Sequence, residues 1–224
     1  MDQPAVPYRS SDLDDRLDTS PVAETETASV SSRRAPRIKT LIRSAKLITK
    51  QGEFVCVVRD VSRTGVRVRL FHALPDEPQM ALQMPSGSTY ELRPVRQMEN
   101  EAGFEFISDV DVETLVHEAS DYPKRALRFS IFFPITVSAP DGRWEAVVEN
   151  LSQQGARFEC EGLFAIDQTL KLVGQEGAEG FSEIDAKVRW RRDNAYGVVF
   201  DNTFSLNDFA TLCMRLQSPM LATD

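Results

Sequence analysis

The sequence predicts an all-β protein built from two similar units in tandem, each a barrel or a sandwich. Three observations support this. Apolar and polar residues alternate in Gly65–Leu70 and in Gly155–Cys160, which is the pattern of half-buried strands. Turn residues separate such segments at intervals of roughly ten residues. A hexapeptide of the form Asp/Asn-x-Ser-x-x-Gly occurs twice, at residues 60–65 and 150–155.

The repetition extends beyond the hexapeptide. A basic cluster precedes each copy, and the clusters that begin at Arg33 and Lys124 are 91 residues apart. The hexapeptides are 90 residues apart, and the Gly-x-x-Phe segments at Gly103 and Gly197 are 94 apart. Landmarks in one order at nearly one offset indicate an internal duplication.

In chain order, the alternating pattern predicts strands at residues 53–59, 65–70, 79–84, 103–107, 131–138, 144–149, 155–160, 169–173, 184–190 and 197–200. Val95-Arg96 and Val188-Arg189 precede the last strand of each unit and are aligned as equivalents. Pro134 cannot donate to a ladder, so its strand is expected at an edge or a bulge.

Two helices are predicted. Ser205, followed by Asp208, is a typical N-cap, and the apolar residues after it recur at helical spacing. We expect the apolar face of this C-terminal helix to dock on its own barrel. A shorter helix is predicted at residues 110–119. Residues 1–32 carry seven acids and one aromatic, so a disordered acidic tail is expected there. The folded units are then 33–120 and 121–224.

The remaining composition argues against several classes of protein. Cys56, Cys160 and Cys213 have no second Cys or His at metal-ligand spacing, so no metal site is expected. No apolar stretch reaches about 18 residues, and the N-terminus is acidic, so we expect a cytoplasmic protein without membrane insertion. His72 and His117 lie apart without a Ser or Cys partner in a known motif. We expect surface or capping histidines, no catalytic residue and no enzymatic activity.

The charge is unevenly distributed. The net charge is −8, yet residues 33–69 hold eleven Lys and Arg against two acids. An acidic protein that concentrates its positive charge in one segment is expected to bind an anion there. Arg67 and Arg69 lie on the strand after the hexapeptide and are expected to face solvent.

The residue types of the first unit suit an anionic purine nucleotide. Arginine matches both phosphate oxygens and the O6/N7 edge of guanine bidentately, and Arg33 and Arg37 offer two such forks. Asp60 can accept from the N1 and N2 donors of guanine, and Ser62 can donate to phosphate or base. Gly65 permits a tight turn and a close backbone approach.

This arrangement resembles the PilZ domain, in which Arg-x-x-x-Arg is followed by Asp/Asn-x-Ser-x-x-Gly and then by a Gly-x-x-Phe strand. Here the hexapeptide follows the second basic residue by 22 or 23 positions. The resemblance implies a six-stranded antiparallel barrel in each unit and a bacterial receptor for cyclic di-GMP. The ligand residues it implies in the first unit are Arg33, Arg34, Arg37, Asp60, Ser62 and Gly65.

The second unit departs from this pattern. Lys124 replaces the first motif arginine, and Asn150 replaces the aspartate. Lysine keeps the charge but loses the planar fork. The sequence therefore predicts a weaker or silent site formed by Lys124, Arg128, Asn150, Ser152 and Gly155.

The resulting hypothesis is a non-catalytic cyclic di-GMP receptor. Binding at the first barrel would change the conformation, and an unidentified partner protein would read that change to control motility, biofilm formation or exopolysaccharide. One alternative is a protein-interaction scaffold with a vestigial nucleotide site. Nucleic-acid binding ranks last, because residues 33–52 contain no aromatic side chain for base stacking, so no nucleic-acid polymer is expected as a partner. Ligand stoichiometry and oligomeric state stay open.

Overall fold

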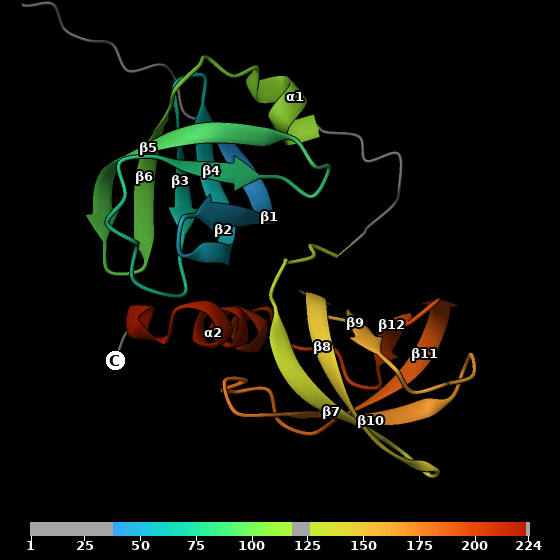
Figure 1. The fold of residues 1–224 in the computed structure, drawn as a ribbon. Coiled ribbons are helices and arrows are strands. Elements are labelled where there is room, and N and C mark those ends of the chain that lie inside the picture. The colour runs from blue at the N-terminus through green and yellow to red at the C-terminus, as the bar shows by residue number, and fades with distance from the viewer. Residues whose placement is uncertain (1–37, 118–125, 223–224) are drawn as a thin grey trace, which may run out of the picture. The chain divides into compact units, whose positions relative to one another are not determined.

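The computed structural model describes residues 38–117 and 126–222 (Figure 1). Within them, twelve strands form two closed barrels of six strands each, with antiparallel neighbours. This confirms the predicted all-β fold class and tandem barrels. Several predictions fall outside the described residues: the tail at 1–32, the cations Arg33, Arg34 and Arg37, and Lys124.

The first barrel contains β1 (Ile38–Thr49), β2 (Gly52–Ser62), β3 (Gly65–Arg69), β4 (Met80–Gln83), β5 (Thr89–Met98) and β6 (Glu101–Phe106), followed by α1 (Val112–His117). Its strands follow one another around the barrel as β1-β2-β3-β6-β5-β4. The second barrel contains β7 (Phe133–Ala139), β8 (Gly142–Ser152), β9 (Gly155–Cys160), β10 (Thr169–Gly174), β11 (Ile184–Arg192) and β12 (Ala195–Phe200), followed by α2 (Leu206–Gln217) and a 3₁₀ turn (Pro219–Leu221). Its strands follow the same circular order, which is the structural signature of the duplication.

All ten predicted strands are present, but the sequence pattern missed β1 and β5 (Figure 1). Both strands carry an irregularity: the register shifts between Lys39 and Arg43 in β1, and between Pro94 and Arg96 in β5. Such a shift does not by itself hide a strand, since β2, β8 and β11 carry one and were predicted. In β5 only Leu92 is buried. The last four residues of β5 are also all exposed, so they show no apolar face.

Pro134 does not lie at the edge of a sheet, because a closed barrel has no edges. It pairs with Val147 of β8 on one side. On the other side the ladder between β7 and β10 ends one residue away, at Ile135 and Gly174. The proline is therefore accommodated at the end of a ladder, where its missing N–H is not needed.

Helix α2 confirms the predicted cap and docking face. The Ser205 side chain accepts a hydrogen bond from the backbone N–H of Asp208. The buried residues of the helix join the core of the second barrel, where Phe209 packs edge-on against Phe129 at 5.4 Å between ring centroids. The helix end also meets β2 of the first barrel, which the sequence did not predict. The Gln217 amide accepts from the N–H of Glu53 at 2.8 Å and donates to its C=O at 2.7 Å.

The expectation of a surface position for His72 is wrong. This side chain is 3% exposed and packs against Phe54, with 4.5 Å between ring centroids. Its Nδ1 lies 2.7 Å from the carbonyl oxygen of Ala73. Nε2 is buried and has no hydrogen-bond partner among the residues that the structure describes. A neutral ring that donates from Nδ1 satisfies this environment, and burial lowers the pKa of His72.

We expect the protein to lose stability as the pH falls below about 6.5, the ordinary histidine pKa. In that range His72 is protonated in the unfolded chain but stays neutral in the folded chain, because its pKa is lower when it is buried. Protonation therefore favours unfolding. Denaturant unfolding at about pH 8 and about pH 5.5 measures the loss. His72→Phe removes the titrating group and should lose less stability across the same interval. Equal losses in both proteins would contradict the assignment.

Candidate ligand-binding site

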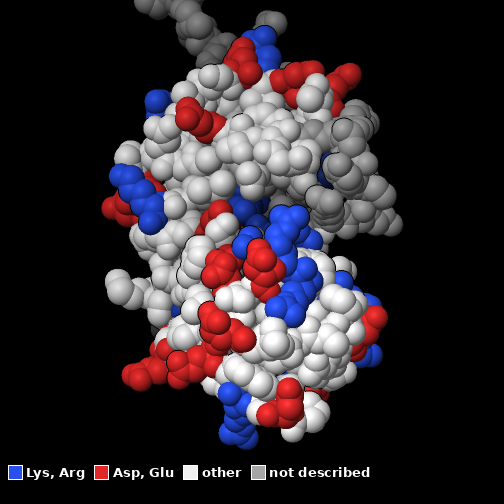
Figure 2. Space-filling model, turned by 45° about the vertical axis from the view of Figure 1, so that its right-hand side comes forward, with Lys and Arg blue, Asp and Glu red and all other residues white. Residues whose placement is uncertain are grey.

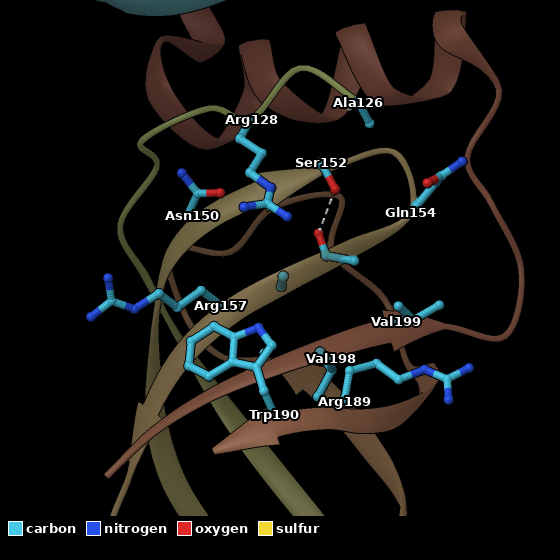
Figure 3. A pocket seen from close by; sticks show the side chains of 13 residues that line it. Ala126, Arg128, Asn150, Ser152, Gln154, Arg157, Arg189, Trp190, Val198 and Val199 are labelled. Atoms are coloured by element: carbon cyan, nitrogen blue, oxygen red, sulfur yellow. Dashed lines mark hydrogen bonds between the residues drawn. The ribbon is translucent and has the colours of Figure 1, made fainter. Parts of the chain in front are cut away.

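A pocket of about 490 Å³ opens on the second barrel (Figure 3). Four residues of the predicted second site line it: Arg128, Asn150, Ser152 and Gly155. The segment before β7 contributes Arg128, and the β8–β9 hairpin contributes the other three. The fifth predicted residue, Lys124, lies outside the described part of the chain.

The motif serine closes its own hairpin in both barrels. Ser152 Oγ donates to the carbonyl oxygen of Gly155 at 3.0 Å, which is the dashed contact in Figure 3. Ser62 Oγ donates in the same way to Gly65 at 3.2 Å and accepts from the Gly65 N–H at 3.1 Å. The hydroxyl proton is thus used within the turn. These bonds explain why a serine at this position stabilises the two-residue connection.

The motif glycine is needed for a close approach of strands rather than for the turn conformation. Neither Gly65 nor Gly155 has a positive φ. A Cβ on Gly65 would lie 2.6 Å from the carbonyl oxygen of Phe104 on β6. A Cβ on Gly155 would lie well under 3.0 Å from the carbonyl oxygen of Val198 on β12. Only a residue without a side chain fits where the hairpin meets the neighbouring strand.

Arg128 and Asn150 are available to a ligand. Their side chains lie next to each other along one side of the pocket (Figure 3). Among the described residues, neither side chain has a hydrogen-bond or ion-pair partner. A guanidinium fork and an amide therefore face the pocket with their donors and the amide oxygen unused.

Trp190 of β11 lines the opposite side of the pocket and was missed by the sequence reasoning (Figure 3). The side chain is 43% exposed. Its ring lies directly over the backbone of Gly197, because a Cβ on that glycine would fall on the indole nitrogen. The signal in the sequence was an aromatic residue on the outward face of a strand, flanked by Arg189 and Arg191. Such interleaving is typical of surfaces that stack bases.

The strand register corrects the alignment of the two copies by one residue. Trp190 pairs with Gly197 across β11 and β12. Arg96 pairs with Gly103 across β5 and β6. Trp190 is therefore the counterpart of Arg96, and the extra residue of each bulge, Val95 or Arg189, precedes it. The second barrel therefore has an aromatic side chain, Trp190, where the first barrel has Arg96.

We expect Gly197→Ala to displace the Trp190 indole. The added methyl would overlap the ring, and the indole can move away because it is 43% exposed. The intrinsic tryptophan fluorescence should shift, with a small change in the free energy of unfolding. Gly103→Ala is the matched control, since the nearest atom to its Cβ would be 3.9 Å away. The same response in both variants would contradict this packing.

In the first barrel the motif aspartate is already paired. Asp60 is 8% exposed, and its Oδ2 accepts from Arg67 Nε at 2.6 Å and from Arg67 Nη2. Arg67 Nη1 donates to Glu101 Oε2 at 3.0 Å. The Arg67 side chain faces outward as expected and is 34% exposed, but it is held in ion pairs with Asp60 and Glu101. The hydrogen bond with Asp60 is the main cause that raises the pKa of Arg67. Arg69 is exposed, as expected, and lies over the ring of Phe71.

The two barrels also differ in the acids near this surface. Glu101 and Glu105 of β6 correspond in register to Ala195 and Val199 of β12. The second barrel has therefore lost two carboxylates at positions that would repel an anion. Figure 2 shows Lys and Arg side chains gathered on the face drawn, with Asp and Glu side chains grouped beside them.

The second barrel matches a known domain family. Residues 123–214 match the model of the PilZ domain. The second barrel is a PilZ domain. The match to the PilZ model covers β7–β12 and most of α2, and the pocket lies within its range. The first barrel repeats the strand order of this PilZ domain.

Three solved structures are similar to between 75% and 83% of this chain. PlzA of Borreliella burgdorferi in complex with c-di-GMP is 12% identical, with 83% of this chain and 95% of that chain covered and a TM-score of 0.34. MotI/DgrA of Bacillus subtilis, an inhibitor of motility, is 12% identical over 80% and 98%, with a TM-score of 0.35. YcgR of Escherichia coli in complex with c-di-GMP is 10% identical over 75% and 79%, with a TM-score of 0.32.

Comparison with curated proteins found no match. Within the residues that the structure describes, no helix has the length and apolar character needed to span a membrane. Across the same residues, no group of three or more His, Cys, Asp or Glu side chains could hold a metal ion.

Proposed function

We propose that this protein is a non-catalytic receptor for cyclic di-GMP and that the pocket of the second barrel holds the nucleotide. One observation carries the proposal. On a PilZ domain, the side chains of Arg128 and Asn150, which have no partner among the described residues, face the exposed indole of Trp190 across one pocket. The volume of about 490 Å³ falls within the range of roughly 300–1,000 Å³ that is usual for small-ligand sites.

Each part of the ligand has a matching group in the pocket. The Arg128 fork suits a phosphate of the cyclic backbone, since arginine binds phosphate bidentately. The indole of Trp190 offers a face on which a guanine base can stack, worth about 1–3 kcal/mol per base in other nucleic-acid sites. The Asn150 amide oxygen can accept from the guanine N1–H or N2–H. None of these contacts calls for a bond to be made or broken, so the site suits binding rather than catalysis.

Calorimetric titration of the full chain with cyclic di-GMP tests the proposal. We expect saturable binding accompanied by a change in tryptophan fluorescence. Cyclic di-AMP is the matched control, because it has the same phosphates but lacks the N1–H and N2 donors of guanine. Absence of heat at millimolar cyclic di-GMP would overturn the proposal and favour the scaffold alternative.

The structure also suggests how binding could be read. Two residues after Arg128, the N–H of Ser130 donates to Glu53 Oε2 of the first barrel at 2.8 Å. Glu53 also pairs with the buried Lys46 at 2.7 Å, and the Lys46 ammonium lies over the Phe129 ring. A ligand that repositions Arg128 would therefore displace Phe129 and Ser130, which contact Lys46 and Glu53 of the first barrel. This supports a conformational change that a partner protein reads, in motility, biofilm or exopolysaccharide control.

Hydrogen exchange tests this linkage. Saturating ligand should change the exchange of β2 amides in the first barrel as well as that of pocket amides. In Glu53→Ala the pocket should still respond, whereas the response of β2 should be lost. If β2 responds equally in both proteins, the linkage does not run through Glu53. The first-barrel site built on Arg33, Arg34 and Arg37 stays a prediction from the sequence.

A further inference from the structure

The duplication supplies an internal comparison of the two motif sites. Asp60 pairs with Arg67 across β2 and β3, directly after a register shift. Asn150 pairs with Arg157 across β8 and β9 at the same place after the same shift. The two arginines are therefore equivalent in the fold, and any difference in their contacts reflects the residues around them.

In the first barrel the arginine occupies the motif acid. Two N–H groups of Arg67, on Nε and Nη2, both reach Oδ2 of Asp60. A carboxylate oxygen has two lone-pair sites, so this oxygen is fully used. Bidentate pairing with the N1–H and N2–H edge of guanine uses both carboxylate oxygens. Guanine could bind Asp60 edge-on only after displacing Arg67, which Glu101 holds from the other side at 3.0 Å.

In the second barrel the equivalent arginine is drawn away. Arg157 Nε lies 3.0 Å from Glu149 Oε2, and its Nη2 lies 3.9 Å from Glu159. Among the described residues Asn150 has no partner. Glu149 and Glu159 replace Arg59 and Arg69 of the first barrel, as the registers of the two hairpins show. The first barrel therefore has an acid at the motif position and arginines on either side, whereas the second barrel has an amide at the motif position and acids on either side.

We propose that the first-barrel motif is closed by its own arginine: Arg67 occupies on Asp60 the place that a guanine edge would take. The second barrel stays open because Glu149 holds the equivalent Arg157. Cyclic di-GMP then binds at Asn150 and not at Asp60, although Asp60 carries the charge that makes it the stronger acceptor. The identity of the ligand in this inference rests on the proposed function. The ion pair between Arg67 and Asp60 is observed in the structure.

Titration of matched variants with cyclic di-GMP tests where the ligand binds. Asp60→Asn should leave the Kd and the number of ligands bound unchanged within about twofold, because the motif acid is not used. Asn150→Ala, at the equivalent position, should raise the Kd by about tenfold or more. The sequence motif by itself predicts the opposite ranking. A loss of ligands bound, or of affinity, in Asp60→Asn would overturn the inference.

A second measurement needs no ligand. Melting temperatures of Asp60→Asn, Arg67→Gln and the double variant form a thermodynamic cycle in the free protein. We expect each single variant to melt lower and the double variant to melt no lower than the worse single one. Additive decreases would mean that the two residues do not interact, and would overturn the inference. If no variant binds cyclic di-GMP, the proposed function fails, and the cycle alone then decides whether Arg67 closes the motif.

Discussion

Replacing Arg128 by alanine is expected to weaken binding of cyclic di-GMP by about a hundredfold. Of the two basic motif residues of the second barrel, Arg128 is the one that the structure describes, and it lines the pocket. It has no competing partner among the described residues. Its fork can therefore pair with phosphate without first breaking an ion pair. A hydrogen bond to a charged group contributes about 1.5–3 kcal/mol, and each 1.4 kcal/mol is about a factor of ten in Kd.

Calorimetry on the full chain measures the effect of Arg128→Ala. Arg143→Ala is the matched control, because Arg143 is an exposed arginine of β8 that does not line the pocket. It tests whether loss of one positive charge anywhere on this barrel is enough. Raising the salt concentration should weaken the control and the wild type equally, since salt screens exposed charges. Equal affinities for Arg128→Ala and the wild type would place the ligand elsewhere.

Replacing Gly155 by alanine is expected to lower the free energy of unfolding by about 3 kcal/mol, at the upper end of overpacking effects. The added methyl would meet the carbonyl oxygen of Val198, with further backbone atoms of β12 close behind. Backbone atoms of a closed barrel cannot rotate away as a flexible side chain can. The hairpin would have to separate from β12 and lose ladder hydrogen bonds, which run from Gly155 opposite Val199 to Glu159 opposite Ala195.

Denaturant unfolding followed by circular dichroism measures the loss in Gly155→Ala. Gly103→Ala provides the comparison, because its Cβ would meet nothing closer than 3.9 Å. We expect the control to stay close to the wild type. A Gly155→Ala protein as stable as the control would show that β12 can move, and would weaken the explanation of why the motif requires glycine.

Much of the fold could be predicted because its signals are local. Alternation in segments such as 65–70 and 155–160 reflects a strand with one buried face, and the repeated hexapeptide marks equivalent hairpins. Strand β5 was missed because Leu92 is its one buried residue, so it shows little alternation. The bulges in β5 and β11 shifted the alignment that made Arg96 and Arg189 equivalent, so the role of Trp190 was not seen.

The candidate site shows where local signals stop. Motif residues such as Arg128, Asn150 and Ser152 were found from residue types and spacing, and the structure brings them to one pocket. The spacing could not show that Arg67 would take the carboxylate of Asp60. The residue types also ranked Asp60 above Asn150, because a carboxylate is a stronger acceptor than an amide. That ranking holds only while the carboxylate is unpaired.

Residue types and their periodicity were enough to identify two repeated all-β units, the hairpin motifs and the chemistry suited to a purine nucleotide. The contacts across the strands decided which of the described motif residues have a partner, and placed Trp190 opposite Arg128. The reason is physical. Burial patterns depend on each residue's own polarity, whereas an arginine's choice between Asp60, Glu101 or Glu149 depends on register and bulges, which bring together residues far apart in the chain.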